Sequence, residues 1–183
     1  DYNDDRYLAA QYTGTVRVNV NGAYGSGTLL YGGKAILTAA HVVEDALSAE
    51  IIFQTDSGQF TRNSSIIITH PEVDLGNVNY DVALIWLSES APTDADRHEL
   101  YRQDALGKDF TAVGYGTYGQ GDIGEQDKFD SYTRLKVANT FDTDGQTLKA
   151  FLGSGLGWRP AVDVQLVADF DSGMADNDAL AMF

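Results

Sequence analysis

The first part of the chain alternates between apolar and polar residues at the two-residue period of half-buried β-strands. Valines alternate with polar residues over 15–20, which predicts a strand with one face in a core. Asn21-Gly22 predicts a tight hairpin turn, and residues 24–31 are predicted to form the returning strand. Gly32-Gly33 predicts a second turn, after which the strand pattern resumes over 35–37.

The pattern continues to residue 87 with short elements. We predict a helical turn within 42–49 and strands over 50–54, 59–62 and 65–69. The run over 80–87 is almost entirely apolar, which predicts a further strand that opens with one acid, Asp81.

A polar, charged stretch over 88–100 separates this part from a second group of strands. Glycine is abundant (19 residues) and proline scarce (3 residues), which favours many tight turns between short strands. The sequence therefore predicts an all-β chain in two lobes joined by a linker. In the second lobe we expect a glycine-rich loop over 115–127 and strands over 110–116, 131–141, 147–152 and 162–170.

Composition limits the classes of partner. The chain has 183 residues and a formal net charge of −15, which argues against binding nucleic acid or an anionic membrane surface. Cysteine is absent, so no disulfide can form, and that leaves both secreted and intracellular locations open. We find no apolar run long enough to span a bilayer. We expect neither nucleic acid nor a membrane as partner.

One histidine lies in an unusual context. The small residues Thr38-Ala39-Ala40 immediately precede His41. They come one predicted hairpin after the strand Gly25-Ser26-Gly27-Thr28-Leu29. A lone histidine beside small residues is ordinarily a core or surface residue, and an imidazole can equally act as a general base. His70, before a proline, is expected to be a turn residue, and His98 to be an exposed residue of the linker.

One aspartate is equally unusual. Asp81 opens the strand Val82-Ala83-Leu84-Ile85-Trp86-Leu87, where a carboxylate is expected to be partly buried. A buried charge requires a partner, although an aspartate at a strand end can also simply cap a loop.

Taken together, these stretches resemble the motifs of trypsin-like serine proteases. The resemblance rests on Thr38-Ala39-Ala40-His41 and on Asn79-Tyr80-Asp81-Val82-Ala83-Leu84, with Ile68-Thr69-His70-Pro71 and Val113-Gly114-Tyr115-Gly116 as lesser matches. It implies a fold of two packed six-stranded antiparallel β-barrels, the second incomplete in this chain. It divides the chain into a first barrel lobe over 1–90, a connection over 91–105 and a partial second barrel lobe over 106–183. It also implies that His41 is the general base and that Asp81 orients it.

The same resemblance leaves two positions for the nucleophile. Phe170-Asp171-Ser172-Gly173 is the nearest match to the family's Gly-Asp-Ser-Gly-Gly, but Phe170 stands where the family has a glycine whose N–H faces the oxyanion. Residues 166–180 also resemble a segment that precedes the nucleophile in some bacterial relatives. That alignment places the serine beyond Phe183, so that a second chain or a carboxy-terminal fragment completes the second barrel.

Acidic residues gather near the end of the chain. Asp169, Asp171, Asp176 and Asp178 offer the oxygen ligands that calcium prefers, and the alternative is a solvated acidic turn. At the other end, Asp1 is too polar for the apolar slot into which trypsin inserts its freed amino terminus, so we expect no activation of that kind. We expect no cofactor to be required for catalysis.

The resulting hypothesis is a serine endopeptidase, secreted or extracellular (or periplasmic), that hydrolyses polypeptides bound in extended form. Two alternatives remain: a non-catalytic relative that acts as a binding module, and an esterase built on the same residues.

Overall fold

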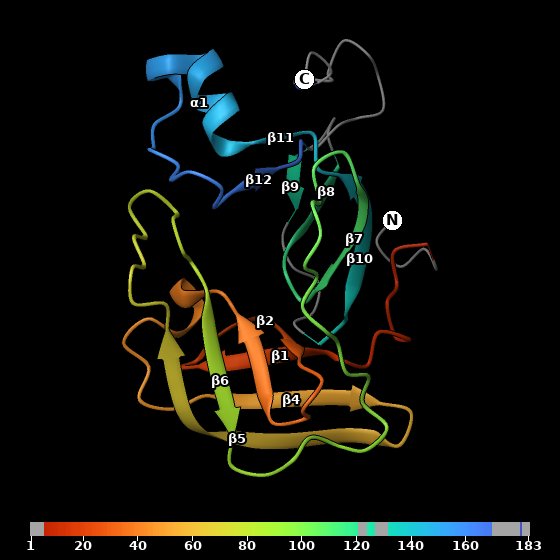
Figure 1. The fold of residues 1–183 in the computed structure, drawn as a ribbon. Coiled ribbons are helices and arrows are strands. Elements are labelled where there is room, and N and C mark those ends of the chain that lie inside the picture. The colour runs from red at the N-terminus through yellow and green to blue at the C-terminus, as the bar shows by residue number, and fades with distance from the viewer. Residues whose placement is uncertain (1–5, 121–123, 127–131, 170–179, 181–183) are drawn as a thin grey trace.

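The computed structural model describes residues 6–120, 124–126, 132–169 and 180. They form two lobes, with a β-barrel at the bottom of Figure 1 and a smaller group of short strands and one helix above it.

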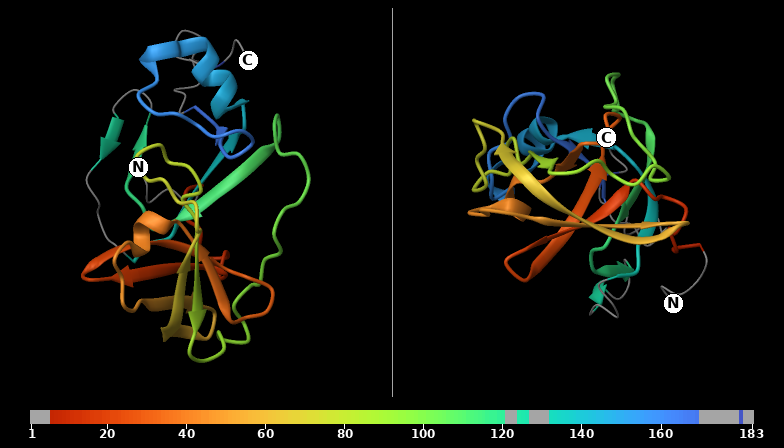
Figure 2. Two further views of the ribbon diagram at one scale, coloured as in Figure 1. Left: turned by 60° about the vertical axis from the view of Figure 1, so that its left-hand side comes forward. Right: turned by 90° about the horizontal axis from the view of Figure 1, so that it is seen from below.

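The lower lobe is a closed antiparallel barrel whose strands follow one another in the order β1-β2-β3-β6-β5-β4 (Figures 1 and 2). Hairpins join β1 to β2, β2 to β3 and β4 to β5, and β6 closes the barrel by pairing with both β3 and β5. The strands are β1 (Thr15–Val20), β2 (Ala23–Leu29), β3 (Ala35–Thr38), β4 (Glu50–Thr55), β5 (Gly58–Thr69) and β6 (Ala83–Leu87).

The turn residues behave as the sequence predicts. Asn21 and Gly22 have φ of 50° and 84°, and Gly33 has φ of 66°, which is the left-handed conformation that tight hairpins require. The predicted strands over 59–62 and 65–69 are one strand, β5, whose register against β6 shifts between Ser64 and Ile66. A β-bulge of this kind interrupts the alternation in the sequence without ending the strand.

The barrel holds the main core. Its buried apolar side chains form one cluster between residues 16 and 95, in which Val16, Val18, Leu29, Ile36 and Phe53 are fully buried. Removing this apolar surface from water supplies the barrel's main stabilisation. Val16, Val18 and Val20 of this cluster are the apolar half of the alternating pattern over 15–20, whereas Ile36, Ile51 and Ile85 come from short continuous apolar runs.

The upper lobe consists of three two-stranded antiparallel sheets within the described residues. Buried large apolar side chains are few there, namely Tyr115, Leu148 and Leu156 among those described. The predicted mainly β fold, with one complete six-stranded barrel and an incomplete second, is confirmed. The pairs are β7 (Asp109–Gly114) with β10 (Leu135–Thr140), β8 (Tyr118–Gln120) with β9 (Gly124–Gln126), and β11 (Thr143–Asp144) with β12 (Leu166–Val167).

Two predictions in the second lobe are wrong. The strand expected over 147–152 is the helix α1 (Gly145–Leu152), because the Asp144 side chain accepts a hydrogen bond from the Thr147 N–H and so caps a helix start. The strand expected over 162–170 is reduced to β12, two residues long. The loop expected over 115–127 contains the hairpin β8–β9, so part of it is a strand pair.

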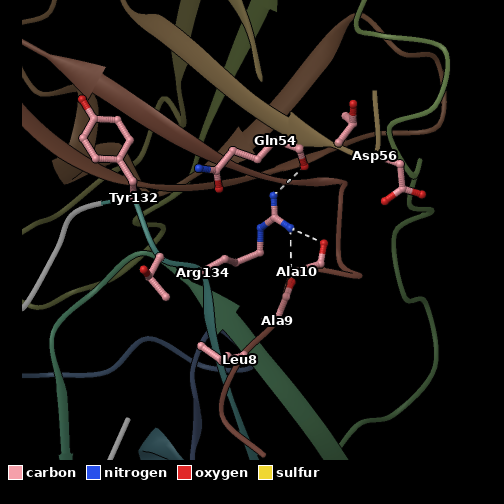
Figure 3. A pocket seen from close by; sticks show the side chains of 9 residues that line it. Leu8, Ala9, Ala10, Gln54, Asp56, Tyr132 and Arg134 are labelled. Carbon is pink, nitrogen blue, oxygen red and sulfur yellow. Dashed lines mark hydrogen bonds between the residues drawn. The ribbon is translucent and has the colours of Figure 1, made fainter. Parts of the chain in front are cut away.

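A buried arginine joins the lobes and the amino-terminal segment (Figure 3). The Arg134 guanidinium, 4% exposed, donates hydrogen bonds to the carbonyls of Ala9 and Ala10. It also donates to the Gln54 carbonyl of the barrel and to the Tyr115 hydroxyl. A cavity of about 350 Å³ lies beside this joint. In the described part of the chain, no helix has the length and apolar character needed to cross a membrane.

Candidate active site

His41 is presented by a short 3₁₀ helix, η1 (Ala40–Val43), that follows β3 directly. Ala40 and Val43 of this helix are buried in the barrel core, so the His41 side chain points outward and is 61% exposed. The predicted helical turn is therefore present, although it begins at Ala40. Val42 packs against the backbone of Gly25, where a Cβ atom would come within 2.8 Å of Val42 Cγ2. The glycine in β2 thus allows η1 to lie close against the barrel.

Asp81 reaches the same place through β6. Thr38 at the end of β3 pairs with Ala83 at the start of β6, so the residues just outside the two strand ends are neighbours. Asp81 lies two residues before Ala83, and its side chain is only 15% exposed. Strand pairing therefore brings together two residues that are 40 positions apart in the sequence.

The Asp81 carboxylate contacts His41 twice, once at the ring and once at the backbone. Asp81 Oδ2 lies 2.6 Å from His41 Nδ1, and Asp81 Oδ1 accepts the backbone N–H of His41 at 2.8 Å. Because an ionised carboxylate only accepts hydrogen bonds, Nδ1 must carry a proton, which in a neutral imidazole leaves Nε2 as the acceptor. The second bond fixes the carboxylate relative to the histidine backbone, so the ring orientation is set as well as its tautomer.

The electrostatics of Asp81 follow from this geometry. Burial alone raises the pKa of the carboxyl, but the hydrogen bonds from the ring and backbone of His41 outweigh burial, and the pKa lies below its ordinary value. Asp81 is therefore a carboxylate at neutral pH. In that state it stabilises a protonated His41 ring, as the partner of a general base must.

The other two histidines, His70 and His98, make contacts within the first lobe and the connection. His70 lies at the end of β5, where its Nδ1 accepts the Glu72 N–H and its ring stacks on Tyr80 at 4.7 Å between centroids. His98 is partly buried, and its backbone N–H donates to the Leu29 carbonyl. His98 is therefore more buried than the linker prediction implies, because the connection pairs with the barrel at Leu30.

Most of the residues proposed as nucleophile or calcium ligands lie near the end of the chain, outside the described residues. Ser172, Asp171, Asp176 and Asp178 lie outside the described residues, so the weak serine candidate and the calcium site stay predictions. Within the described residues, the ring of His41 makes hydrogen bonds only through Nδ1, and no group of three or more potential metal-ligating side chains occurs. Of the four acids, only Asp169 is described; its Oδ2 accepts the Leu180 N–H.

Sequence reasoning missed the residues that anchor the Asp81 loop. Asn77, Asn79 and Gln165 form hydrogen bonds between this loop and the second lobe. The asparagines stand just before Asp81 in the sequence, and this proximity is a signal that could have identified them. Gln165 offered no signal, because its place opposite the loop depends on the arrangement of the two lobes.

The geometry can be compared with known proteins. Among solved structures the chain is similar to GrC, with a TM-score of 0.64 and 18% identity, covering 81% of this chain and 69% of that one. It is also similar to HL collagenase, with a TM-score of 0.58 and 22% identity, covering 74% of this chain and 62% of that one. At these identities the likeness concerns the fold. No curated protein matches the chain significantly.

The sequence itself matches one protein family. The model of the family described as Trypsin matches residues 4–147, which is more than half of the chain and includes both His41 and Asp81. The fold and the contact between the His41 and Asp81 side chains both agree with this family match. The chain belongs to the trypsin family.

Proposed function

We propose that this protein is a serine endopeptidase in which His41 is the general base and Asp81 is the acid that orients it. The observation that carries the proposal is the 2.6 Å contact between His41 Nδ1 and Asp81 Oδ2 in a chain of the trypsin family. Acyl transfer by serine requires an imidazole held in one tautomer with its free nitrogen directed at the nucleophile.

The proton steps follow from the site. His41 Nε2 accepts the proton of the serine hydroxyl as its oxygen attacks the substrate carbonyl, and the ring becomes positively charged. The carboxylate of Asp81, 15% exposed and held by two hydrogen bonds, stabilises that charge. The ring then donates the same proton to the leaving amine. Water repeats the sequence on the acyl-enzyme and restores the serine.

The serine is proposed to come from outside the described residues. Residues 166–180 resemble the segment that precedes the serine in some bacterial relatives, and this resemblance supports a nucleophile beyond residue 183, on a second chain or a carboxy-terminal fragment. Ser172, which lies outside the described residues, is the second candidate. The chain spans 69% of GrC and 62% of HL collagenase.

Substrates of the proposed enzyme are polypeptides bound in extended form along a strand edge of the second lobe. The proposed location is secreted or extracellular, which fits a soluble hydrolase of polypeptides with a strongly negative net charge. The acidic segment from Asp169 onward is proposed to take calcium as a structural ion, with no part in the proton steps.

A fluorophosphonate probe tests the proposal, because it reacts covalently only with an activated serine. The protein isolated from its natural source is labelled, digested and analysed by mass spectrometry. We expect one adduct, on a peptide outside residues 1–183, and at least about a hundredfold slower labelling in the His41→Ala variant. An adduct on Ser172 would revise the location of the nucleophile. The absence of any adduct in folded protein would refute the enzyme and favour a binding module.

A further inference from the structure

The loop that leads into Asp81 is carried by both lobes. Asn79, 7% exposed, donates from Nδ2 to the carbonyl of Arg159 at 2.9 Å and accepts the N–H of Ala161 at Oδ1, at 2.8 Å. Asn77 Oδ1 accepts the N–H of Arg159 at 2.8 Å. Both partner residues belong to the second lobe, so the Asp81 loop, which begins in the first lobe, is fastened across the interface.

Gln165 completes this connection from the other side. Its Nε2 lies 2.9 Å from the Asn77 carbonyl, 3.0 Å from the Val78 carbonyl and 2.9 Å from Asn79 Oδ1. Its own Oε1 accepts the indole N–H of Trp158 at 3.1 Å. One second-lobe side chain, itself held by a tryptophan, therefore contacts three consecutive residues of the loop.

The loop backbone needs such support. Val78 and Tyr80 have φ of 55° and 53°, in the left-handed region that a β-branched or aromatic residue rarely adopts. These residues flank Asn79, and Tyr80 immediately precedes Asp81. Strained conformations persist only where surrounding contacts over-determine them. The hydrogen bonds to Asn79 and to the Val78 carbonyl are contacts of that kind.

We propose that Asn79 and Gln165 are positioning residues that form an inter-lobe latch and hold the Asp81 carboxylate in hydrogen-bonding register with His41. The latch does not touch the reacting atoms. It fixes the backbone two residues before Asp81, so that the acid meets the ring only when the second lobe is docked on the first. This inference rests on the proposed function only for its catalytic consequence; the positional effect is independent of activity.

Because the latch joins the two lobes, the contact between Asp81 and the His41 ring requires the second lobe to be docked on the first. Separation of the lobes would release the Asn79 and Gln165 contacts together and let the Val78–Tyr80 backbone relax to negative φ. Asp81 would then move relative to η1, which is anchored in the barrel core through Ala40 and Val43. The loop that carries the acid is thus held from both lobes, by Asp74 within the first lobe and by Gln165 of the second, whereas the base is held by the barrel core.

The test uses NMR of the natural protein and its variants to observe the His41 Nδ1 proton directly, because a proton shared with a carboxylate resonates far downfield. Asn79→Ala and Gln165→Met are the test variants. Asn19→Ala and Asn139→Ala are the controls: Asn19 bonds Glu50 within the barrel, and Asn139 bonds the Asp169 carbonyl within the second lobe. Solvent exchange of the resonance is measured at a temperature where circular dichroism shows every variant to be folded.

We expect exchange of the Nδ1 proton to accelerate about tenfold in both test variants and less than twofold in both controls. Asn79→Asp, which keeps the acceptor for Ala161, should recover part of the protection. Unchanged exchange in folded Asn79→Ala and Gln165→Met would overturn the latch. In the natural protein, kcat should fall about tenfold with little change in KM. Wild-type protein without activity would refute the proposed enzyme alone, since the NMR result does not depend on turnover.

Discussion

Replacing Asp81 by asparagine tests the electrostatic account of the site, because the two side chains have almost the same shape. The asparagine oxygen can still accept the backbone N–H of His41, now at 2.8 Å from Asp81 Oδ1. The amide –NH2, however, would face the Nδ1–H across the present 2.6 Å contact, so that two donors oppose each other. The ring must then move its proton to Nε2, and the nitrogen needed to accept the serine proton is lost.

The magnitude follows from the contact that is removed. A hydrogen bond to a charged group contributes about 1.5–3 kcal/mol, and the 61% exposure of the His41 side chain places this one near the lower end. We expect Asp81→Asn to lower the free energy of unfolding by about 1.5 kcal/mol, which for a chain of this size is a Tm decrease of about 3–6 °C. In the active protein the wrong tautomer should reduce kcat by about 10⁴-fold.

The stability difference must depend on pH with a definite sign. The pKa of Asp81 is lower in the folded protein than its ordinary value of 3.8, so its stabilisation is fully present above that value and is lost as the pH falls through the folded pKa. Wild type should therefore be more stable to urea than Asp81→Asn throughout neutral and mildly acidic pH. The two curves should converge below pH 3.8.

Asp104→Asn is the control, since that exposed carboxylate accepts the Leu106 N–H but has no imidazole partner in the structure. It should change stability by less than about 0.5 kcal/mol. If Asp81→Asn were as stable as wild type at neutral pH, or if the difference persisted unchanged below pH 3.8, the described role of the Asp81 carboxylate would be wrong.

Three further predictions follow from other contacts. Gly25→Ala places a Cβ 2.8 Å from Val42 Cγ2, so it should cost about 1–3 kcal/mol in urea unfolding, and Val42→Ala in the same chain should recover most of it. Arg134→Met removes the donor to the carbonyls at 9–10, so it should cost about 3 kcal/mol and hasten proteolysis near those residues; unchanged cleavage would contradict that anchoring. Calcium at about a hundred times its Kd should raise stability by about 2.7 kcal/mol, less in Asp169→Asn; an unchanged Tm would exclude the ion.

The barrel is predictable because most of its core residues lie in short strands whose apolar residues are visible in the local sequence. Val16 and Val18 are fully buried, and both lie in the strand that the alternating pattern over 15–20 predicts. Asn21-Gly22 and Gly33 adopt the positive φ that their residue types favour, so the hairpin connections are predictable as well. The continuous strand β5 could not be foreseen, since its bulge breaks the alternation.

The second lobe is less predictable because few of its side chains are deeply buried. Residues 147–152 contain Leu148, Phe151 and Leu152 at helical spacing, but Leu152 and Phe151 are exposed, and the apolar run reads equally well as a short strand. The signal that decides the helix is the cap by Asp144, one residue before α1. A short helix with few buried side chains is determined more by its capping residues than by the spacing of its apolar residues.

The candidate site divides in the same way. His41 and Asp81 were identified from the sequence through the resemblance of their motifs, and pairing of β3 with β6 explains why they meet. Asn79 and Gln165 were not identified, since their role depends on a contact 86 residues apart in the sequence. Long-range polar contacts of this kind leave no periodic trace in either segment.

Hydrolysis of internally quenched peptides measures directly whether this protein cleaves peptide bonds with His41 as its base. Wild-type protein from its natural source is compared with His41→Ala and with His98→Ala, whose altered side chain belongs to the connection between the lobes. We expect turnover in wild type and in His98→Ala, and a loss of about 10⁴-fold or more in His41→Ala. Equal turnover in the two variants, or none in folded wild type, would contradict the claim.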